Sequence, residues 1–266
     1  MPEAADSTTL VSVSDTNVKF AQTLCVRPEI HKSDFILDFV VNALWHGDKE
    51  RGTRNYFELG AYSANLAKEL VSEVTKTKAR LKESWSPTSV LDFASGYGCV
   101  ARFLSQVFPA SVVSACDIHK QAVEFNRDIL DLSSFQSTAE PDNLIGVPRV
   151  DVLMALSFFS HMPKRTFHRW LQTLVSTVAS GGVLIFTANG HVTHKTNCPD
   201  MILDTDGFGF KRASEQKDLS LDEYGLTVSY PRYVFEILKS IPNVRLARFS
   251  EALWWGSQDT YVCIKD

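Results

Sequence analysis

The residues best suited to chemistry form a short turn that contains an acid and two glycines and follows a predicted strand. The apolar run 90–93 carries Asp92 and leads into Ala94, Gly96 and Gly98. Glycines let the backbone pass close to a ligand, and the N–H groups of a helix that begins after such a turn point toward it. This pattern predicts a site for a nucleotide-like cofactor at the carboxyl end of the first strand of a parallel sheet.

A second carboxylate follows at the spacing that such a site requires. The next predicted strand, 112–117, ends in Asp117, nineteen residues beyond Gly98, and Ile118 comes directly after it. A carboxylate at this position can accept hydrogen bonds from both hydroxyl groups of a ribose. The alternative is that Asp117 only caps its own strand.

Residues 96–101 also satisfy the dinucleotide pattern G-x-G-x-x-A, so a nicotinamide-dependent oxidoreductase is the second enzyme class to weigh. Asp92 argues against it, because a carboxylate at the end of the first strand would face and repel the pyrophosphate of a dinucleotide. The ammonium group at the amino-acid end of S-adenosylmethionine would be attracted to the same carboxylate.

From about residue 56 onward, the sequence resembles the class I S-adenosylmethionine-dependent methyltransferases. The turn 92–98 is similar to the first motif of that family, with Ala94 where a glycine is commoner, and Asp117 is similar to its ribose-binding acid. Ser157 and His161 match an S-x-x-x-H signature that ends the fourth strand of many relatives. The resemblance implies S-adenosylmethionine as the cofactor, S-adenosylhomocysteine as its product, and a seven-stranded sheet with one reversed strand.

The resemblance also implies which residues contact the cofactor. Segment 55–60 resembles an aromatic-plus-glycine segment that closes over the methionine end, although core packing is an equal alternative for Tyr56. Ser137 lies where many relatives have an Asp that binds adenine. The predicted cofactor contacts are Tyr56, Gly60, Asp92, Ala94, Gly96, Gly98, Asp117, Ile118, Ser137, Ser157 and Phe158.

Methyl transfer requires an aligned acceptor, the exclusion of water and, for some acceptors, the removal of a proton. His161 is the candidate base, since an imidazole titrates near neutral pH, and holding its loop is the alternative role. Phe159, His191 and Tyr224 are the predicted acceptor contacts. We predict no metal, because the H-x2-H-x3-C spacing from His191 to Cys198 lacks a fourth ligand.

Short strands that alternate with helices after residue 88 predict an α/β fold. We expect a doubly wound Rossmann-like sheet of seven strands, mostly parallel, with one antiparallel strand near the C-terminus and an N-terminal helical cap. Residues 1–17 are predicted to be disordered, 18–80 to form the cap and 81–266 the cofactor-binding domain, with a lid-like insert at about 190–230. Predicted cap helices span 31–45, with the inward residues Phe35, Ile36, Phe39 and Val40, and 62–78, with Leu66, Leu70 and Val74.

Composition narrows the partners. The 266 residues include 27 basic and 31 acidic side chains, a net charge of −4 that offers no basic face for nucleic acid. Five scattered cysteines favour reduced thiols in the cytoplasm, and no apolar run approaches the length of about 20 residues that crosses a membrane. The sequence therefore favours methylation of an oxygen or nitrogen atom of a small molecule, such as a sugar, a lipid-linked compound or a secondary metabolite. A protein methyltransferase and a non-catalytic cofactor-binding protein remain alternatives.

Overall fold

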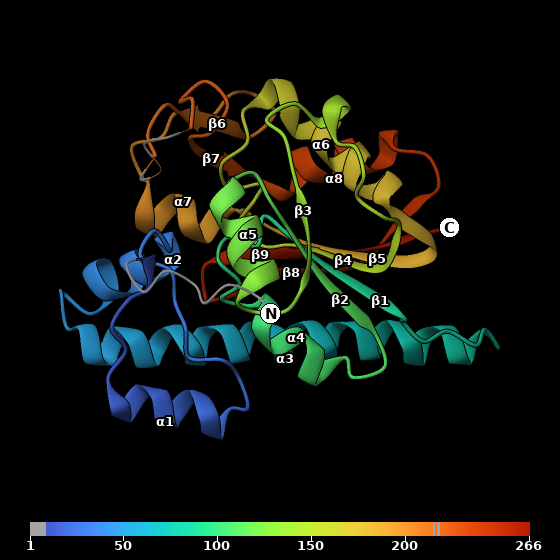
Figure 1. Ribbon diagram of the computed structural model, residues 1–266. Coiled ribbons are helices and arrows are strands. Elements are labelled where there is room, and N and C mark those ends of the chain that lie inside the picture. Colours follow the sequence, from blue (N-terminus) through green and yellow to red (C-terminus); the bar gives the residue numbers. More distant parts are fainter. Residues whose placement is uncertain (1–8, 215, 217–218) are drawn as a thin grey trace.

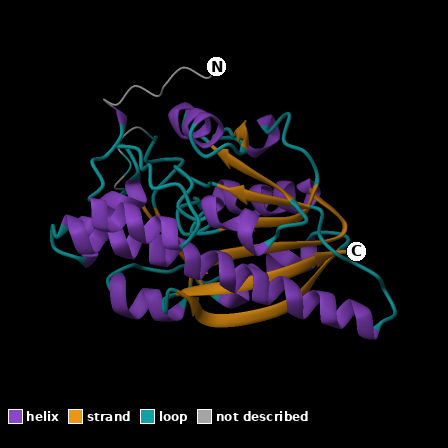
Figure 2. Ribbon diagram, turned by 60° about the horizontal axis from the view of Figure 1, so that its bottom comes forward, coloured by secondary structure: helices purple, strands orange, loops and turns teal. Residues whose placement is uncertain are grey.

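The computed structural model describes residues 9–214, 216 and 219–266. Its main element is a seven-stranded sheet in the order β3-β2-β1-β4-β5-β9-β8 (Figures 1 and 2). The strands are β1 Ser89–Phe93, β2 Val112–Asp117, β3 Ser133–Gln136, β4 Val150–Ala155, β5 Val178–Asn189, β8 Val244–Trp254 and β9 Gln258–Lys265. The first five are parallel, and β9 runs antiparallel to both β5 and β8. The predicted topology with one reversed strand is confirmed.

Helices cover both faces of the sheet. One face carries α3 Lys49–Arg80, α4 Ala101–Val107 and α5 Lys120–Asp128, and the other carries α6 Lys164–Thr177 and α8 Pro231–Ser240. Alternation within the strands explains this division, since Val90 packs into the first cluster and its neighbour Leu91 into the second. Figure 1 shows α3 and α4 below the sheet and α6 and α8 above it.

The N-terminal residues are more ordered than predicted. Residues 1–8 of the segment predicted to be disordered lie outside the described residues, but Leu10 bridges to His31 and the helix α1 spans Asp15–Thr23. Ser14 caps this helix by accepting a hydrogen bond from the N–H of Asn17 (3.3 Å). The prediction of disorder is therefore wrong for residues 9–17.

The first predicted cap helix is shorter and oriented differently than expected. Asp34 caps α2 (Phe35–Phe39), which continues as one π-helical turn, η2 (Val40–Leu44). Ile36 and Phe39 are 42% and 52% exposed, so their predicted inward positions are wrong. Val40 is buried as predicted, and the other inward side chains are those of Leu37 and Val41, which lie with it on one helix face at the spacing i, i+3, i+4.

The second cap helix, α3, begins thirteen residues before the predicted start at Tyr62, with Asp48 as its cap. Its predicted inward residues, Leu66, Leu70 and Val74, are buried. Two glycines inside the helix allow close contacts, because a Cβ at Gly52 would lie 2.6 Å from a Val41 methyl group and a Cβ at Gly60 would overlap the carbonyl oxygen of Cys99. Tertiary contacts therefore stabilise the first part of α3 as a helix, although its two glycines lower its intrinsic helix propensity.

The insert after β5 has its own elements. It contains α7 His191–Asn197 and an antiparallel pair, β6 Phe208–Lys211 and β7 Leu226–Ser229. A 3-10 turn, η3 Pro141–Asn143, precedes β4. Within the described part of the chain, no helix is both long and apolar enough to span a membrane. All five cysteines are unpaired, and Cys99, Cys116 and Cys263 are buried.

Replacement of Gly60 by Ala should destabilise the fold. Alanine in a helix gains up to about 1 kcal/mol over glycine, but its Cβ would press on a backbone carbonyl that cannot rotate away, and overpacking costs about 1 to 3 kcal/mol. Since the Cβ would overlap that carbonyl oxygen, we take the upper part of the overpacking range, about 2 to 3 kcal/mol, and expect a net loss of roughly 1 to 2 kcal/mol in urea unfolding. Lys68→Ala, on the exposed side of the same helix, is the control and should change the unfolding free energy by less than about 0.5 kcal/mol. A G60A protein as stable as the wild type would contradict the contact between α3 and α4.

Candidate cofactor and acceptor site

The turn after β1 has the backbone geometry that its small residues predict. Ala94, Gly96 and Gly98 all have positive φ angles, of 59°, 52° and 75°. A Cβ at Gly98 would lie 2.5 Å from Oδ1 of Asn126, so this glycine allows helix α5 to approach the turn. A Cβ at Gly96 would meet no heavy atom within 4 Å, so the backbone at Gly96 borders open space. Gly98 thus allows close packing against α5, and Gly96 leaves room for a ligand.

Asp117, at the end of β2, fastens this turn. Its Oδ2 accepts a hydrogen bond from the N–H of Gly96 (2.8 Å), and its Oδ1 accepts one from the N–H of His119 (2.9 Å). The Nδ1 atom of His119 lies 2.8 Å from the same Oδ1. An ionised carboxylate has about four lone-pair positions, so these bonds leave capacity for a hydroxyl donor. The predicted contact to a ribose stays a prediction.

Asp92 is buried beside Asp117 and has an unusual pKa. Burial and, to a smaller extent, the neighbouring charge of Asp117 raise the pKa of Asp92 to about 7, although a hydrogen bond from the N–H of Ala101 opposes both. The side chain is 3% exposed. A positive group placed next to it would relieve this electrostatic cost and favour the ionised form.

Asn126, which the sequence analysis missed, holds the turn from α5. Its Nδ2 donates to the carbonyl oxygen of Gly96 (2.9 Å) and to the hydroxyl of Ser95 (3.3 Å). The side chain is fully buried. Its role could have been suspected from the sequence, because Asn126 is a polar residue on the otherwise apolar face of α5, directly after Phe125.

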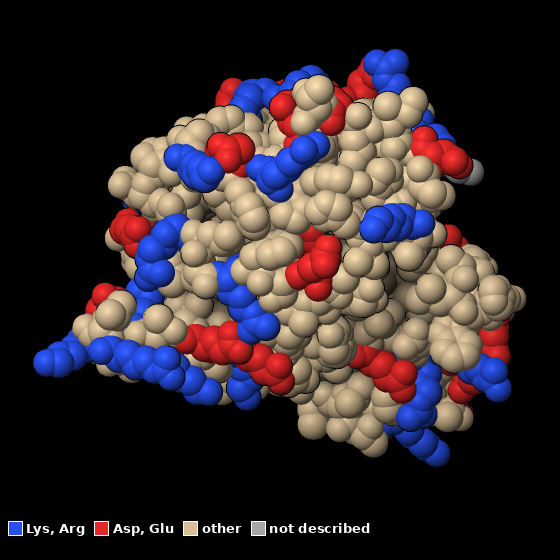
Figure 3. Space-filling model, turned by 180° about the vertical axis from the view of Figure 1, so that it is seen from behind, with Lys and Arg blue, Asp and Glu red and all other residues tan. Residues whose placement is uncertain are grey.

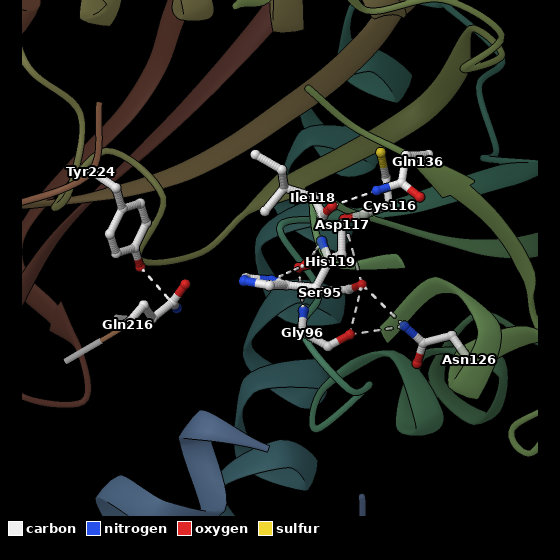
Figure 4. Close-up of polar contacts among 10 residues, drawn as sticks. All are labelled: Ser95, Gly96, Cys116, Asp117, Ile118, His119, Asn126, Gln136, Gln216 and Tyr224. Atoms are coloured by element: carbon white, nitrogen blue, oxygen red, sulfur yellow. Dashed lines mark hydrogen bonds and ion pairs between the residues drawn. The ribbon is translucent and has the colours of Figure 1, made fainter. Parts of the chain in front are cut away.

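Two predicted cofactor residues flank Asp117. The N–H of Ser137 donates to the carbonyl oxygen of Asp117 (2.8 Å), and the amide of Gln136 donates to the carbonyl oxygen of Ile118. Figure 4 shows Ile118, Asp117 and His119 in one group with Ser95 and Gly96. The carboxyl ends of β1, β2 and β3 therefore bring these predicted residues together, although an adenine contact at Ser137 is still only a prediction.

The loop after β4 is shaped by buried polar side chains from the next strands of the sheet. The N–H of Ser157, whose φ is 57°, donates to the hydroxyl of Thr187 (2.7 Å). Gln258 of β9 accepts from Thr187 (2.6 Å) and donates to the hydroxyl of Ser157 (2.9 Å). Phe158 packs edge-on against Phe93, with ring centroids 5.1 Å apart. Ser157 and Phe158 thus lie beside the end of β1.

His161 is held by the insert. Its Nδ1 lies 2.8 Å from the carbonyl oxygen of Gly225, which can only accept, so Nδ1 carries the proton and the neutral ring has its lone pair on Nε2. The ring stacks on Tyr224, with centroids 4.3 Å apart and planes at 9°. Tyr224 also accepts a hydrogen bond from Gln216 (3.2 Å), and Figure 4 shows this pair apart from the Asp117 group. This tautomer is the one that a general base acting through Nε2 requires.

Three predicted ligand contacts are core residues. Tyr56 is fully buried, and its hydroxyl donates to Oδ2 of Asp34 (2.6 Å). Gly60 lies in the contact between α3 and α4. Phe159 is also fully buried, against Phe167 and Phe186. Tyr56 and Phe159 have no exposed surface, so core packing, the alternative role of Tyr56, accounts for both side chains. A cofactor contact at Gly60 stays a prediction.

The remaining predicted acceptor residue, His191, is the first residue of α7. Its ring packs against that of Tyr230 at a tilt of 33°, with ring centroids 3.8 Å apart, and its Nδ1 lies 3.6 Å from Glu251. His194 uses both ring nitrogens, on the hydroxyl of Tyr230 (2.7 Å) and the carbonyl oxygen of Met201 (2.9 Å). Among the residues that the structure describes, no group of three or more His, Cys, Asp or Glu side chains could hold a metal ion.

No protein-family model and no curated protein sequence matches this chain. Solved structures do match it, and those described below are similar to it in fold. A methyltransferase from Clostridium acetobutylicum described as S-adenosylmethionine-dependent has a TM-score of 0.54 at 12% identity and covers 86% of this chain and 97% of its own. The chain has the class I methyltransferase fold.

Two further structures share this methyltransferase fold. The plantazolicin methyltransferase BpumL, solved with a monoazolic desmethyl analogue and S-adenosylhomocysteine, has a TM-score of 0.53 at 12% identity and covers 94% of this chain and 99% of its own. DesVI from Streptomyces venezuelae has a TM-score of 0.53 at 14% identity and covers 86% and 98%. At these identities, the likeness establishes the methyltransferase fold and its strand order.

The pKa of Asp92 predicts a pH-dependent effect of Asp92→Asn. Since the folded-state pKa lies near 7, above the ordinary value near 4, the ionised carboxylate destabilises the native state, and this cost grows as pH rises from about 4 to 7. The asparagine variant avoids this cost. In thermal unfolding without ligand, the Tm of D92N relative to wild type should therefore be higher at pH 8 than at pH 5.

Asp151→Asn is the matched control, because its carboxylate has the opposite environment. Burial alone would raise the pKa of Asp151, but hydrogen bonds from Thr88 and Ser89 outweigh burial and lower it. Its ionised form stabilises the fold, so D151N should lower the Tm at pH 8, and this loss should shrink as pH falls toward 3. The same pH trend in both variants would mean that Asp92 is not electrostatically strained.

Proposed function

We propose that this protein is an S-adenosylmethionine-dependent methyltransferase that methylates an oxygen or nitrogen atom of a small molecule. The observation that carries the proposal is the arrangement of Asp92, Gly96 and Asp117 at the carboxyl ends of β1 and β2. It combines an open backbone at Gly96 with a buried carboxylate whose raised pKa makes a positive neighbour favourable. The carboxyl edge at a switch point of strand order is where open α/β sheets bind ligands.

The residues fit S-adenosylmethionine better than a dinucleotide. Asp117 would accept hydrogen bonds from the ribose hydroxyls, and Asp92 would attract the ammonium group of the methionine moiety. A pyrophosphate beside Gly96 would instead face two carboxylates. The BpumL structure contains S-adenosylhomocysteine, which supports the same cofactor for a chain with the same fold.

The bound cofactor supplies an activated methyl group, so the protein itself must orient the acceptor, exclude water and handle one proton. We assign the proton to Nε2 of His161, whose tautomer is set by the carbonyl oxygen of Gly225. Tyr224, stacked on His161, forms one wall beside the imidazole. The hydroxyl of Tyr224 and the ring of His191 are the remaining candidates for contact with the acceptor.

A small-molecule acceptor agrees with the charge distribution and with the structural neighbours. Basic and acidic side chains are interspersed on the face shown in Figure 3, which is unlike the basic surface that nucleic-acid enzymes use. The neighbour BpumL was solved with an analogue of the natural product plantazolicin. These observations support a natural-product or metabolite acceptor ahead of nucleic acid.

Calorimetric titration of the purified protein tests the cofactor. We expect S-adenosylmethionine and S-adenosylhomocysteine to bind, and NAD and NADP to give no heat of binding. Asp117→Ala should weaken binding of both sulfur compounds by about 1 to 3 kcal/mol, because it removes hydrogen bonds to a buried charged acceptor. Exclusive binding of a nicotinamide dinucleotide would refute the methyltransferase proposal, and undiminished affinity in D117A would remove Asp117 from the site.

His161→Ala tests the proposed base. Once an acceptor has been found by screening metabolites for S-adenosylhomocysteine formation, this variant should turn over at least about a hundredfold more slowly. Its affinity for S-adenosylmethionine should stay within about twofold of wild type, since no proton moves when the cofactor binds at the strand ends. His168→Ala, on the exposed side of α6, should retain full turnover and serves as the control. A full-speed H161A enzyme would reduce His161 to a loop-holding residue.

A further inference from the structure

A buried arginine next to the cofactor turn has no role in the chemistry proposed above. Arg102 is 6% exposed and lies in the first turn of α4. Its Nε donates to the carbonyl oxygen of Gly98 (2.9 Å) and its Nη2 to that of Tyr97 (3.3 Å). Its Nη1 donates to the carbonyl oxygens of Arg27 and Glu29, both at 3.0 Å. One guanidinium thus joins the glycine turn to a segment that lies seventy residues earlier in the chain.

The positive charge of Arg102 is balanced through a tyrosine. Nη2 of Arg102 donates to the hydroxyl of Tyr56 (3.2 Å), and that hydroxyl donates to Oδ2 of Asp34 (2.6 Å). Asp34 is 2% exposed, and its Oδ1 accepts hydrogen bonds from the N–H groups of Ile36 and Leu37. The relay Arg102–Tyr56–Asp34 therefore ends at the cap of α2.

A second contact joins the same two parts of the chain. His31 stacks on Tyr97 with ring centroids 4.3 Å apart and planes at 6°, and its edge faces Phe125 at 5.7 Å. His31 is 9% exposed. Segment 27–34 is thus attached to the cofactor turn by hydrogen bonds at one end and by ring stacking in the middle.

We propose that Arg102 is a positioning residue for the cofactor, which couples segment 27–34 to the turn 95–99. The inference rests on the proposed function. Fixing the carbonyl groups of Tyr97 and Gly98 fixes the two planar peptide units that follow them, and these units form the backbone at the cofactor site. Cofactor affinity then depends on contacts made by residues far from the Rossmann core, and cofactor binding in turn stabilises segment 27–34.

An arginine is suited to this role and a lysine is not. The planar guanidinium has five N–H donors, and here they meet five oxygen acceptors. A lysine has three donors on one nitrogen, so Arg102→Lys keeps the charge but leaves buried carbonyl groups unpaired. Tyr56→Phe removes only the hydroxyl that links Arg102 to Asp34.

The first measurement compares cofactor affinity by calorimetry. R102K should bind S-adenosylmethionine and S-adenosylhomocysteine at least tenfold more weakly, and Y56F should show a smaller loss. Val234→Ala is the control for a general loss of stability, because this fully buried residue of α8 lies on the opposite face of the sheet. V234A should lower the Tm and leave the affinity within twofold. Because R102K can also lower the Tm, the comparison is made at temperatures equally far below each protein's Tm.

The second measurement needs no ligand and no turnover. Segment 27–34 contains one trypsin site, after Lys32, because the bond after Arg27 leads to Pro28 and is resistant to trypsin. Cleavage there should be slow in the wild type and in V234A, and faster in R102K. Saturating S-adenosylhomocysteine should slow cleavage of the wild type, whereas R102K should gain much less protection because the segment is no longer coupled to the turn.

The outcomes separate the two proposals. A wild-type protein that binds neither sulfur compound would overturn the proposed function and the coupling together. Wild-type affinity in R102K, or equal protection of both proteins from trypsin, would overturn the coupling alone and make Arg102 a purely structural residue.

Discussion

The parallel pairing of β1 with β2 places two carboxylates close together in a site that excludes water. Asp92 and Asp117 lie at or next to the ends of neighbouring strands, each is 5% exposed or less, and the charge of Asp117 helps to raise the pKa of Asp92. Hydrogen bonds from the surrounding backbone partly offset the repulsion between the two carboxylates. Backbone N–H groups of Gly96 and His119 stabilise Asp117, and the N–H of Ala101 reaches Asp92. A positive group next to Asp92 would lower the electrostatic cost of its ionised form.

The sheet could be predicted from the sequence because its central strands, such as β1, β4 and β9, are apolar and largely buried, in contrast to the more exposed edge strands β3 and β8. All seven expected strands are present, including the closing antiparallel pair β8 and β9. The first motif could be predicted as well, since an acid, small residues and a second acid at fixed spacing have one common structural use. Local pattern and global fold agree in this part of the chain.

The rest depended on tertiary contacts that no local pattern contains. Gly52 and Gly60 weakened the expected helix, yet both lie inside α3, where close contacts with Val41 and Cys99 leave no room for a side chain. In α2, Leu37 faces the core, and Ile36 and Phe39 face away from it. Asn126 and Arg102 were missed for a related reason. From the sequence alone, a polar residue on a helix is expected to face solvent. The loop that such a residue binds can be identified only from the structure.

The connection among Ser157, Thr187 and Gln258 has a consequence for how the protein is made. Gln258 belongs to β9, the last strand of the sheet in chain order, and its amide fixes the loop that leads to His161. During synthesis the cofactor turn and its two acids emerge early, together with the strands that hold them. The β4 loop can reach its final shape only when β9 has entered the sheet between β5 and β8. A nascent chain halted before this strand would contain the turn 94–98 and both acids, but the loop after β4 would lack its contact with Gln258, so this loop is the last part of the candidate site to form.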